Sequence, residues 1–121
     1  MSVSYKNNII FKWNEFAQKY NLPIIKEIKS GSLRWKNLRA RSAEKDFDFT
    51  LLVDIIENSP FLLGKTKHLF FVFFDWVIKP ANYQKIIEGN YLDRQSYQKF
   101  SGIIEGLKDI QKESDEANKN G

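Results

Sequence analysis

Cysteine is absent from this chain of 121 residues, and histidine occurs once, as His68. The lack of cysteine excludes disulfides, thiolate metal sites and cysteine nucleophiles, and it fits a reducing compartment such as the cytoplasm. A single histidine without a cluster of acidic residues around it forms neither a zinc site nor a catalytic triad. We therefore expect no bound metal and no catalytic histidine.

Long apolar runs are also lacking. The longest of them, Leu69 to Phe74, is closed by Asp75, and it is far shorter than the roughly 20 residues that a membrane-spanning helix needs. The first residues contain no apolar stretch of the kind found in signal peptides. These absences predict a cytoplasmic protein that does not act in a membrane.

No group of residues in the sequence indicates catalysis. Gly64-Lys65-Thr66 imitates the end of a phosphate-binding loop, but Ser59 stands where that motif requires its first glycine. Most acidic residues lie at expected helix starts or in the polar C-terminal end, and Asp75 is expected to cap a helix that starts at Trp76. Because no nucleophile or acid–base pair can be assembled, we expect no enzymatic activity and no cofactor.

Aromatic residues are plentiful, at 15% of the chain, and the apolar fraction is 42%. This composition predicts one compact core, and the length is sufficient for one domain. Apolar residues recur at helical spacing, as Ile9, Trp13 and Phe16 do. Ser32 and Asp48 are the kind of residue that begins a helix, so we predict that each caps the helix that follows it.

The sequence predicts an all-α fold with about five helices in a single domain over residues 1–113, followed by a disordered polar tail over residues 114–121. We expect helical segments over residues 8–20, 33–44, 49–57, 73–79, 82–88 and 96–113, with Pro80 ending the fourth of them. Residues 61–73 form either a short β-hairpin or an irregular loop, and we favour the loop.

Positive charge is concentrated in the first part of the chain. Residues 1–45 hold ten Lys or Arg against three Asp or Glu, and residues 46–121 hold nine against twelve. This asymmetry favours an acidic or polyanionic partner for the first part. The alternative is that lysine is simply the common surface residue of a Lys-rich and Asn-rich sequence.

The most basic element is the helix expected over residues 33–44. Its cations, and those of the segment before it, are candidate phosphate contacts: Arg34, Lys36, Arg39 and Arg41 in the helix, supported by Lys26 and Lys29. Trp35 is placed to stack on a base. The alternative is an ordinary amphipathic helix, in which Trp35 is buried and the Arg and Lys stems lie along the edge of the core.

Five sequence blocks follow one another along the chain: Asn21-Leu22-Pro23-Ile24-Ile25-Lys26, the basic helix from Arg34 to Arg41, Ser59-Pro60-Phe61-Leu62-Leu63-Gly64, Phe74-Asp75-Trp76-Val77-Ile78-Lys79-Pro80, and Lys85-Ile86-Ile87-Glu88-Gly89-Asn90-Tyr91. In this order they resemble the C-terminal module of many phage and prophage replication proteins, over about residues 10 to 94. The Phe-Asp-Trp and Glu-Gly-Asn-Tyr blocks are the most specific part. That module often follows a winged-helix domain, which we do not expect in these residues.

The resemblance implies a role in phage-type DNA replication, as a replisome organiser or helicase-recruiting accessory module without enzymatic activity. DNA and a replicative helicase or helicase loader are the partners that it implies. Two alternatives stay open: a protein–protein adaptor that does not touch DNA, and a small regulatory phage protein. For the adaptor, the docking surface would be the segment Phe70 to Trp76 or the C-terminal helix. A solvent-facing patch of Phe70, Phe71 and Phe73 larger than roughly a few hundred Å² would favour it, whereas burial would make these residues part of the core.

Overall fold

The computed structural model describes the backbone of residues 1–45 and 47–119, and the side chains of residues 1–45 and 47–107. Within these residues the fold is all-α, as the sequence predicted, and forms a single small domain without strands. Its helices are α1 (Val3–Lys19), α2 (Leu33–Ser42), α3 (Phe49–Glu57), α4 (Phe74–Val77), α5 (Pro80–Ile87) and α6 (Arg94–Lys119).

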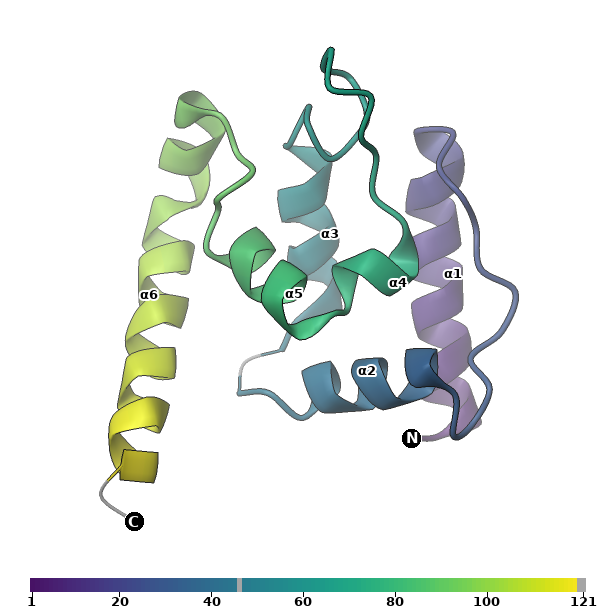
Figure 1. The fold of residues 1–121 in the computed structure, drawn as a ribbon, viewed down its shortest axis with the longest axis horizontal. Coiled ribbons are helices and arrows are strands. Elements are labelled where there is room, and N and C mark those ends of the chain that lie inside the picture. The colour runs from purple at the N-terminus through teal and green to yellow at the C-terminus, as the bar shows by residue number, and fades with distance from the viewer. Residues whose placement is uncertain (46, 120–121) are drawn as a thin grey trace.

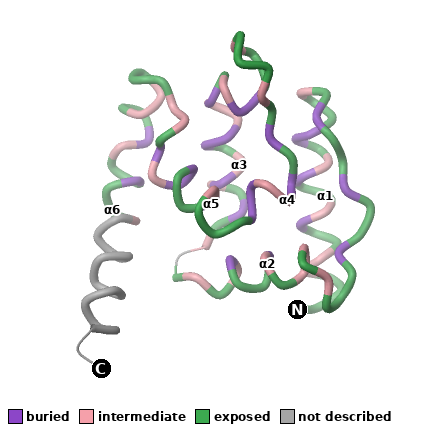
Figure 2. Tube along the Cα trace, viewed as in Figure 1, coloured by how far each residue is buried: buried purple, intermediate pink, exposed green. Residues whose placement is uncertain are grey.

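Helix α3 lies in the middle of the fold, in contact with α1 on one side and with α5 on the other (Figure 1). Helix α2 crosses below α1 and α3, and α6 stands at the edge of the molecule farthest from α1. Every helix contributes buried positions to the core (Figure 2), including Trp13, Leu38, Ile56, Phe74 and Ile104. The rings of Trp13 and Phe74 meet edge to face at 5.5 Å, which joins α1 to α4 at the centre of the core.

The helix starts follow the capping chemistry that the sequence predicted. The Ser32 hydroxyl accepts a hydrogen bond from the Trp35 amide at 3.1 Å, and the Asp48 carboxylate accepts one from the Leu51 amide at 3.0 Å. Each bond satisfies an amide that has no partner within its helix. Helix α1 begins earlier than the predicted residue 8, because Ser2 caps it in the same way.

The preceding helix ends before Pro80, as predicted, but at Val77 and not at Lys79, so that α4 is four residues long. The sequence analysis placed the start of the next helix at residue 82, whereas Pro80 itself begins α5, because the first residue of a helix needs no amide donor and the ring already holds a helical φ. The prediction that Asp75 caps a helix was wrong: Phe73 occupies the N-cap position, and Asp75 lies in the first turn of α4.

Residues 61–73 form an irregular loop, the alternative that the sequence analysis favoured. The described residues show one backbone hydrogen bond across it, from the Val72 amide to the Leu62 carbonyl at 2.9 Å. The loop is anchored at its base by buried Ser59, which donates to the Tyr91 carbonyl at 2.6 Å and accepts from the Leu62 amide at 3.2 Å. The loop itself projects beyond the helices (Figure 1).

The backbone of α6 is helical to Lys119, whereas the sequence predicted an end near Glu113. The predicted disorder of residues 114–121 stays a prediction, because the side chains from residue 108 onward and residues 120–121 lie outside the described part. None of the helices in that part is long and apolar enough to cross a membrane.

Candidate nucleic-acid interface

Helix α2 is held against the core by one face and exposes the other. Leu38 is fully buried, and the Tyr5 hydroxyl of α1 forms a 2.7 Å hydrogen bond with the Ser42 hydroxyl at the last residue of α2. The opposite face carries exposed Leu33, Lys36 and Arg39. Four of the six predicted phosphate contacts lie on this helix, and the structure separates them into two pairs with different surroundings.

Arg34 is engaged with the protein itself. Its Nε and Nη2 donate to the two carboxylate oxygens of Asp75 at 2.7 and 2.9 Å, and its Nη1 donates to the Glu27 carbonyl at 2.9 Å. The hydrogen bond to Asp75 raises the pKa of the Arg34 guanidinium. This bidentate pair joins α2 to α4. Arg34 is therefore engaged as a structural cation: Nε, Nη1 and Nη2 each donate a hydrogen bond within the protein, and its charge is paired with Asp75.

Arg41 is buried, with 7% of its surface exposed. Its Nη1 donates to the Ile78 carbonyl at 3.2 Å, and its Nε lies 3.2 Å from a carboxylate oxygen of Glu44, at an angle unsuited to a hydrogen bond. Burial raises the pKa of Glu44 despite the nearby guanidinium. The position of Arg41 removes it from the candidate phosphate contacts, because a phosphate cannot reach a cation that is covered by the protein.

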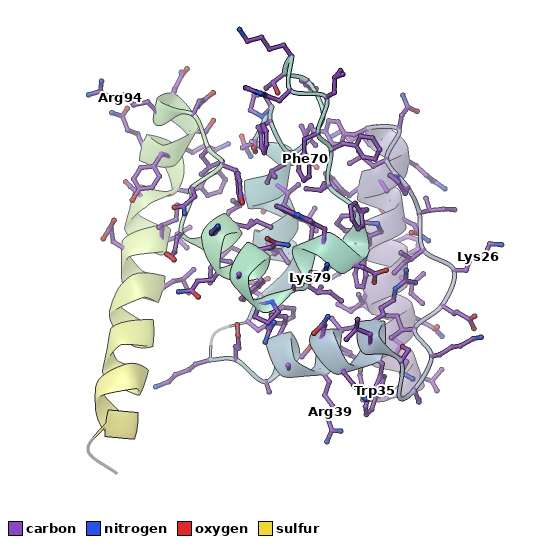
Figure 3. The ribbon with its side chains drawn as sticks, in the orientation of Figure 1. Lys26, Trp35, Arg39, Phe70, Lys79 and Arg94 are labelled. Atoms are coloured by element: carbon purple, nitrogen blue, oxygen red, sulfur yellow. The ribbon has the colours of Figure 1, made fainter. Side chains whose placement is uncertain are left out.

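Lys36 and Arg39 point into solvent (Figure 3 labels Arg39). Neither forms an ion pair within the described side chains. The Arg39 guanidinium lies over the Trp35 ring, 5.1 Å from its centroid, so it is positioned by a cation–π contact and keeps its N–H groups free. Trp35 is half-buried and one face is covered by Arg39, which makes it a support for the cation more than a platform for base stacking.

The two lysines before α2 lie on the extended segment that connects it to α1. Both are exposed, and Lys26 points away from the body of the molecule (Figure 3). Lys29 forms a 3.6 Å ion pair with Glu27, and both partners of that pair are largely exposed. Exposed pairs of this kind contribute little and exchange readily for another anion. Lys26 and Lys29 thus stay available as phosphate contacts.

Sequence reasoning missed one cation of this surface. Lys6 belongs to α1, but its Nζ donates to the Ser30 hydroxyl at 2.8 Å, 24 residues away in the sequence. That bond places the ammonium beside the turn that leads into α2. The sequence could not have placed Lys6 on this surface, because the contact joins two residues that are far apart in the chain and share no motif.

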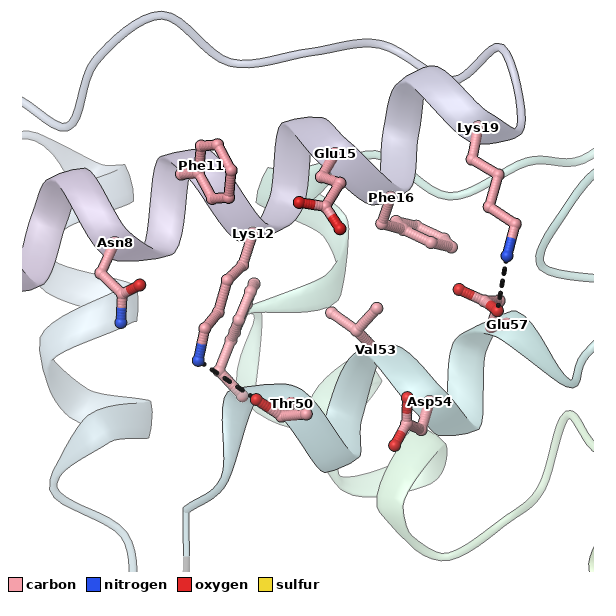
Figure 4. Close-up of a pocket in the computed structure, with 11 residues that line it drawn as sticks. Asn8, Phe11, Lys12, Glu15, Phe16, Lys19, Thr50, Val53, Asp54 and Glu57 are labelled. Carbon is pink, nitrogen blue, oxygen red and sulfur yellow. Dashed lines mark hydrogen bonds and ion pairs between the residues drawn. The ribbon is translucent and has the colours of Figure 1, made fainter.

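A groove with a volume of about 430 Å³ lies between α1 and α3 (Figure 4). Its floor is apolar and its rim is charged, with Lys19 paired to Glu57 at 3.3 Å and Lys12 donating to Thr50 at 3.2 Å. The pairing with Glu57 raises the pKa of Lys19. Nowhere in the described residues do three or more His, Cys, Asp or Glu side chains come together in a way that could hold a metal ion.

The docking segment proposed as an alternative is exposed in part. Phe71 and Phe73 are 47% and 41% exposed, and Leu69 is 87% exposed. Phe70 is half-buried, with its ring stacked on that of Phe61 at 5.1 Å and tilted against that of Trp76 at 5.0 Å. Phe71 and Phe73 thus face solvent, whereas Phe70 packs partly into the core.

No protein-family model matches the chain, and no curated protein or solved structure is significantly similar to it. The resemblance to phage replication modules therefore continues to rest on the sequence blocks alone.

Proposed function

We propose that the chain is a nucleic-acid-binding accessory module that contacts phosphates through the outer face of α2 and the segment before it. The observation that carries this proposal is the pair Lys36 and Arg39: both are exposed, neither is neutralised by a carboxylate, and Arg39 is held in place by Trp35. Cations that are held in place but not paired can bind the phosphates of a nucleic acid, and binding is favoured because it releases the counterions condensed on the nucleic acid.

The distribution of ion pairs supports the same surface. Arg34 and Arg41 are neutralised internally by Asp75 and Glu44. Lys26, Lys29, Lys36 and Arg39 remain to face solvent, and among the described side chains only Glu27 pairs with any of them. The surface thus keeps net positive charge after its internal pairs are counted, which attracts an anionic partner from a distance.

A role in phage-type DNA replication is proposed on the sequence resemblance. In that role the module would hold DNA through α2 while another surface engages a replicative helicase or helicase loader. The protein would act by bringing its partners together, with no chemical step of its own.

Fluorescence anisotropy with labelled single- and double-stranded DNA tests the proposal. The variant Lys36→Ala/Arg39→Ala should bind at least about tenfold more weakly at low salt, because two phosphate contacts are lost. The matched control Lys85→Ala/Lys99→Ala removes two exposed lysines from α5 and α6, and it should bind within about twofold of the wild type if binding follows the α2 surface and not net charge. Equal losses in the two variants, or no binding by the wild-type chain, would refute the proposal.

A further inference from the structure

A second surface lies where the chain runs from the projecting loop into α4. The segment 70–73 is not helical, its backbone is extended at Phe73 with φ −137° and ψ 160°, and it runs down to α4 between α3 and α1 (Figure 1). Burial alternates along this segment: Val72 is fully buried, whereas Phe71 and Phe73 are exposed. Alternation of this kind is the pattern of a strand that has one side in the core and the other in solvent.

The backbone of this segment has one unpaired edge. The Val72 amide is bonded to the Leu62 carbonyl, and in an extended chain the amides of Phe71 and Phe73 point to the opposite side. Neither of those amides donates a hydrogen bond within the described residues. An unpaired extended edge with exposed apolar side chains is a template for the addition of another strand, and proteins usually cover or charge such an edge.

A shallow pocket beside the edge is suited to side chains of an added strand. It has a volume of about 260 Å³ and is lined by Pro23, Ile24 and Phe73, with the Arg34–Asp75 pair at its end. Ile24 is 52% exposed although it is a large apolar residue. The segment that carries Ile24 is fixed to α1, because the Asn14 side chain both donates to the Ile25 carbonyl and accepts from the Ile25 amide, each at 2.8 Å.

The charges around this edge indicate the chemistry of its partner. Lys65 adjoins Gly64, which packs against Phe71, and the Lys65 ammonium reaches over the Tyr20 ring at 5.3 Å. Lys65 and Lys67 belong to the loop that leads into this edge, and neither forms an ion pair within the described side chains. Asp75, which lines the pocket beside Phe73, is already paired with Arg34. The edge is therefore apolar, with two unpaired cations in the loop before it and a neutralised carboxylate after it.

We propose that the edge Phe71–Phe73, with Ile24 and the lysines of the loop, is a docking site for an extended acidic segment of a partner protein, which adds as a β-strand. Such a segment would alternate acidic residues, facing the lysines, with branched or aromatic residues that cover Phe71 and Phe73. A second copy of this chain is a poor occupant, because it would bring the same lysines against each other. A nucleic acid is less suitable than a peptide, because its phosphates can accept from the amides of the edge but offer no N–H donor to the carbonyls beside them.

Selection of a displayed random heptapeptide library on the immobilised full chain tests this proposal. The selected peptides should alternate Asp or Glu with Ile, Val, Leu or Phe. Their affinity should fall at least about tenfold in Phe71→Ser/Phe73→Ser and in Lys65→Glu/Lys67→Glu. The control Phe11→Ser removes an exposed aromatic ring, 66% exposed, from α1, and it should bind the same peptides as well as the wild type does. The charge variant keeps both rings, so the proposal stays testable if the serine variant folds poorly.

Two further measurements separate the competing occupants. Amide hydrogen exchange at Phe71 and Phe73 should slow when a selected peptide is bound, because strand addition gives each amide an acceptor. The proposal is overturned if no peptide is selected, if the selected peptides lack acidic residues, or if exchange at these amides is unchanged. The variant Phe71→Ser/Phe73→Ser also tests the competing occupants. If it abolishes self-association in sedimentation, the edge binds a second copy of the chain, and if it abolishes DNA binding, the edge binds nucleic acid; either result overturns the proposal. DNA binding that persists in this variant keeps the proposed function of α2 separate from the docking site.

Discussion

Replacement of Arg41 by alanine should destabilise the fold strongly, whereas the same change at Arg39 should not. Arg41 is 7% exposed and bonded to the Ile78 carbonyl and paired with Glu44. Removing one partner of a fully buried ion pair costs about 3–5 kcal/mol. Because the Glu44 side chain is 33% exposed, solvent screens part of that cost, and we expect about 3 kcal/mol.

That loss corresponds to a fall in Tm of about 10 °C for a domain of this size. Arg39 gives the matched comparison two residues away on the same helix. It loses only an exposed cation–π contact with Trp35, worth about 0.5–1 kcal/mol. Urea unfolding of both variants, followed by far-UV circular dichroism, measures the difference. Equal destabilisation by the two substitutions, or a cost below about 1 kcal/mol at Arg41, would refute the division of the α2 arginines into structural and binding residues.

The cost at Arg41 should also depend on pH. Burial already raises the pKa of Glu44 in the wild type, and loss of the guanidinium raises it further. A carboxyl whose folded pKa lies above its unfolded value of about 4.3 does not lower the free energy of unfolding while it is protonated. It lowers that free energy as pH rises through the folded pKa and the buried group ionises. The penalty of Arg41→Ala should therefore be smaller at about pH 4 than at pH 7. A penalty that is larger at pH 4 would contradict this reasoning.

Two other positions give predictions for stability. Burial raises the pKa of Tyr83 to about 12, so the stability that its neutral form contributes is present below about pH 10 and is lost as pH rises from 10 to 12. This loss amounts to at most about 3 kcal/mol, and urea unfolding at several pH values should show that Tyr83→Phe removes it; an unchanged pH profile would contradict the assignment. Gly89 has φ +79°, and a Cβ there would lie 2.8 Å from Tyr97 and 2.9 Å from Ile104. Gly89→Ala should cost roughly 3 kcal/mol, whereas Gly102→Ala, which meets nothing within 4 Å, should stabilise α6 by up to about 1 kcal/mol; a similar effect of the two in thermal unfolding would refute the steric account.

The parts of the fold that depend on local chemistry were predicted well from the sequence. The bounds of α3, Phe49–Glu57, agree with the prediction, because Asp48 caps its start and its apolar residues keep helical spacing. The start of α5 at Pro80 was missed, because a proline is compatible both with the end of one helix and with the first residue of the next. The choice depends on whether the chain after it can pack, and Tyr83 and Ile86 of α5 are buried in the core.

The candidate site was predicted only as a basic helix. Which arginines stay free is decided by partners far away in the chain: Asp75 lies 41 residues from Arg34, and Ile78 lies 37 residues from Arg41. Charge patterning within a helix carries no information on such contacts. Asp75 stands between large apolar residues in the sequence, but its side chain is 44% exposed in the fold, and nothing in the sequence identifies Arg34 as its partner.

The salt dependence of DNA binding tests the central claim, that the free cations of α2 and its preceding segment contact phosphates. Four contacts, from Lys26, Lys29, Lys36 and Arg39, predict a slope of log K against log salt of about −3.6 on duplex DNA, or about 150-fold weaker binding after a fourfold rise in salt. Lys36→Ala/Arg39→Ala should reduce the slope to about −1.8. A wild-type slope near zero, or one that this variant leaves unchanged, would contradict the claim.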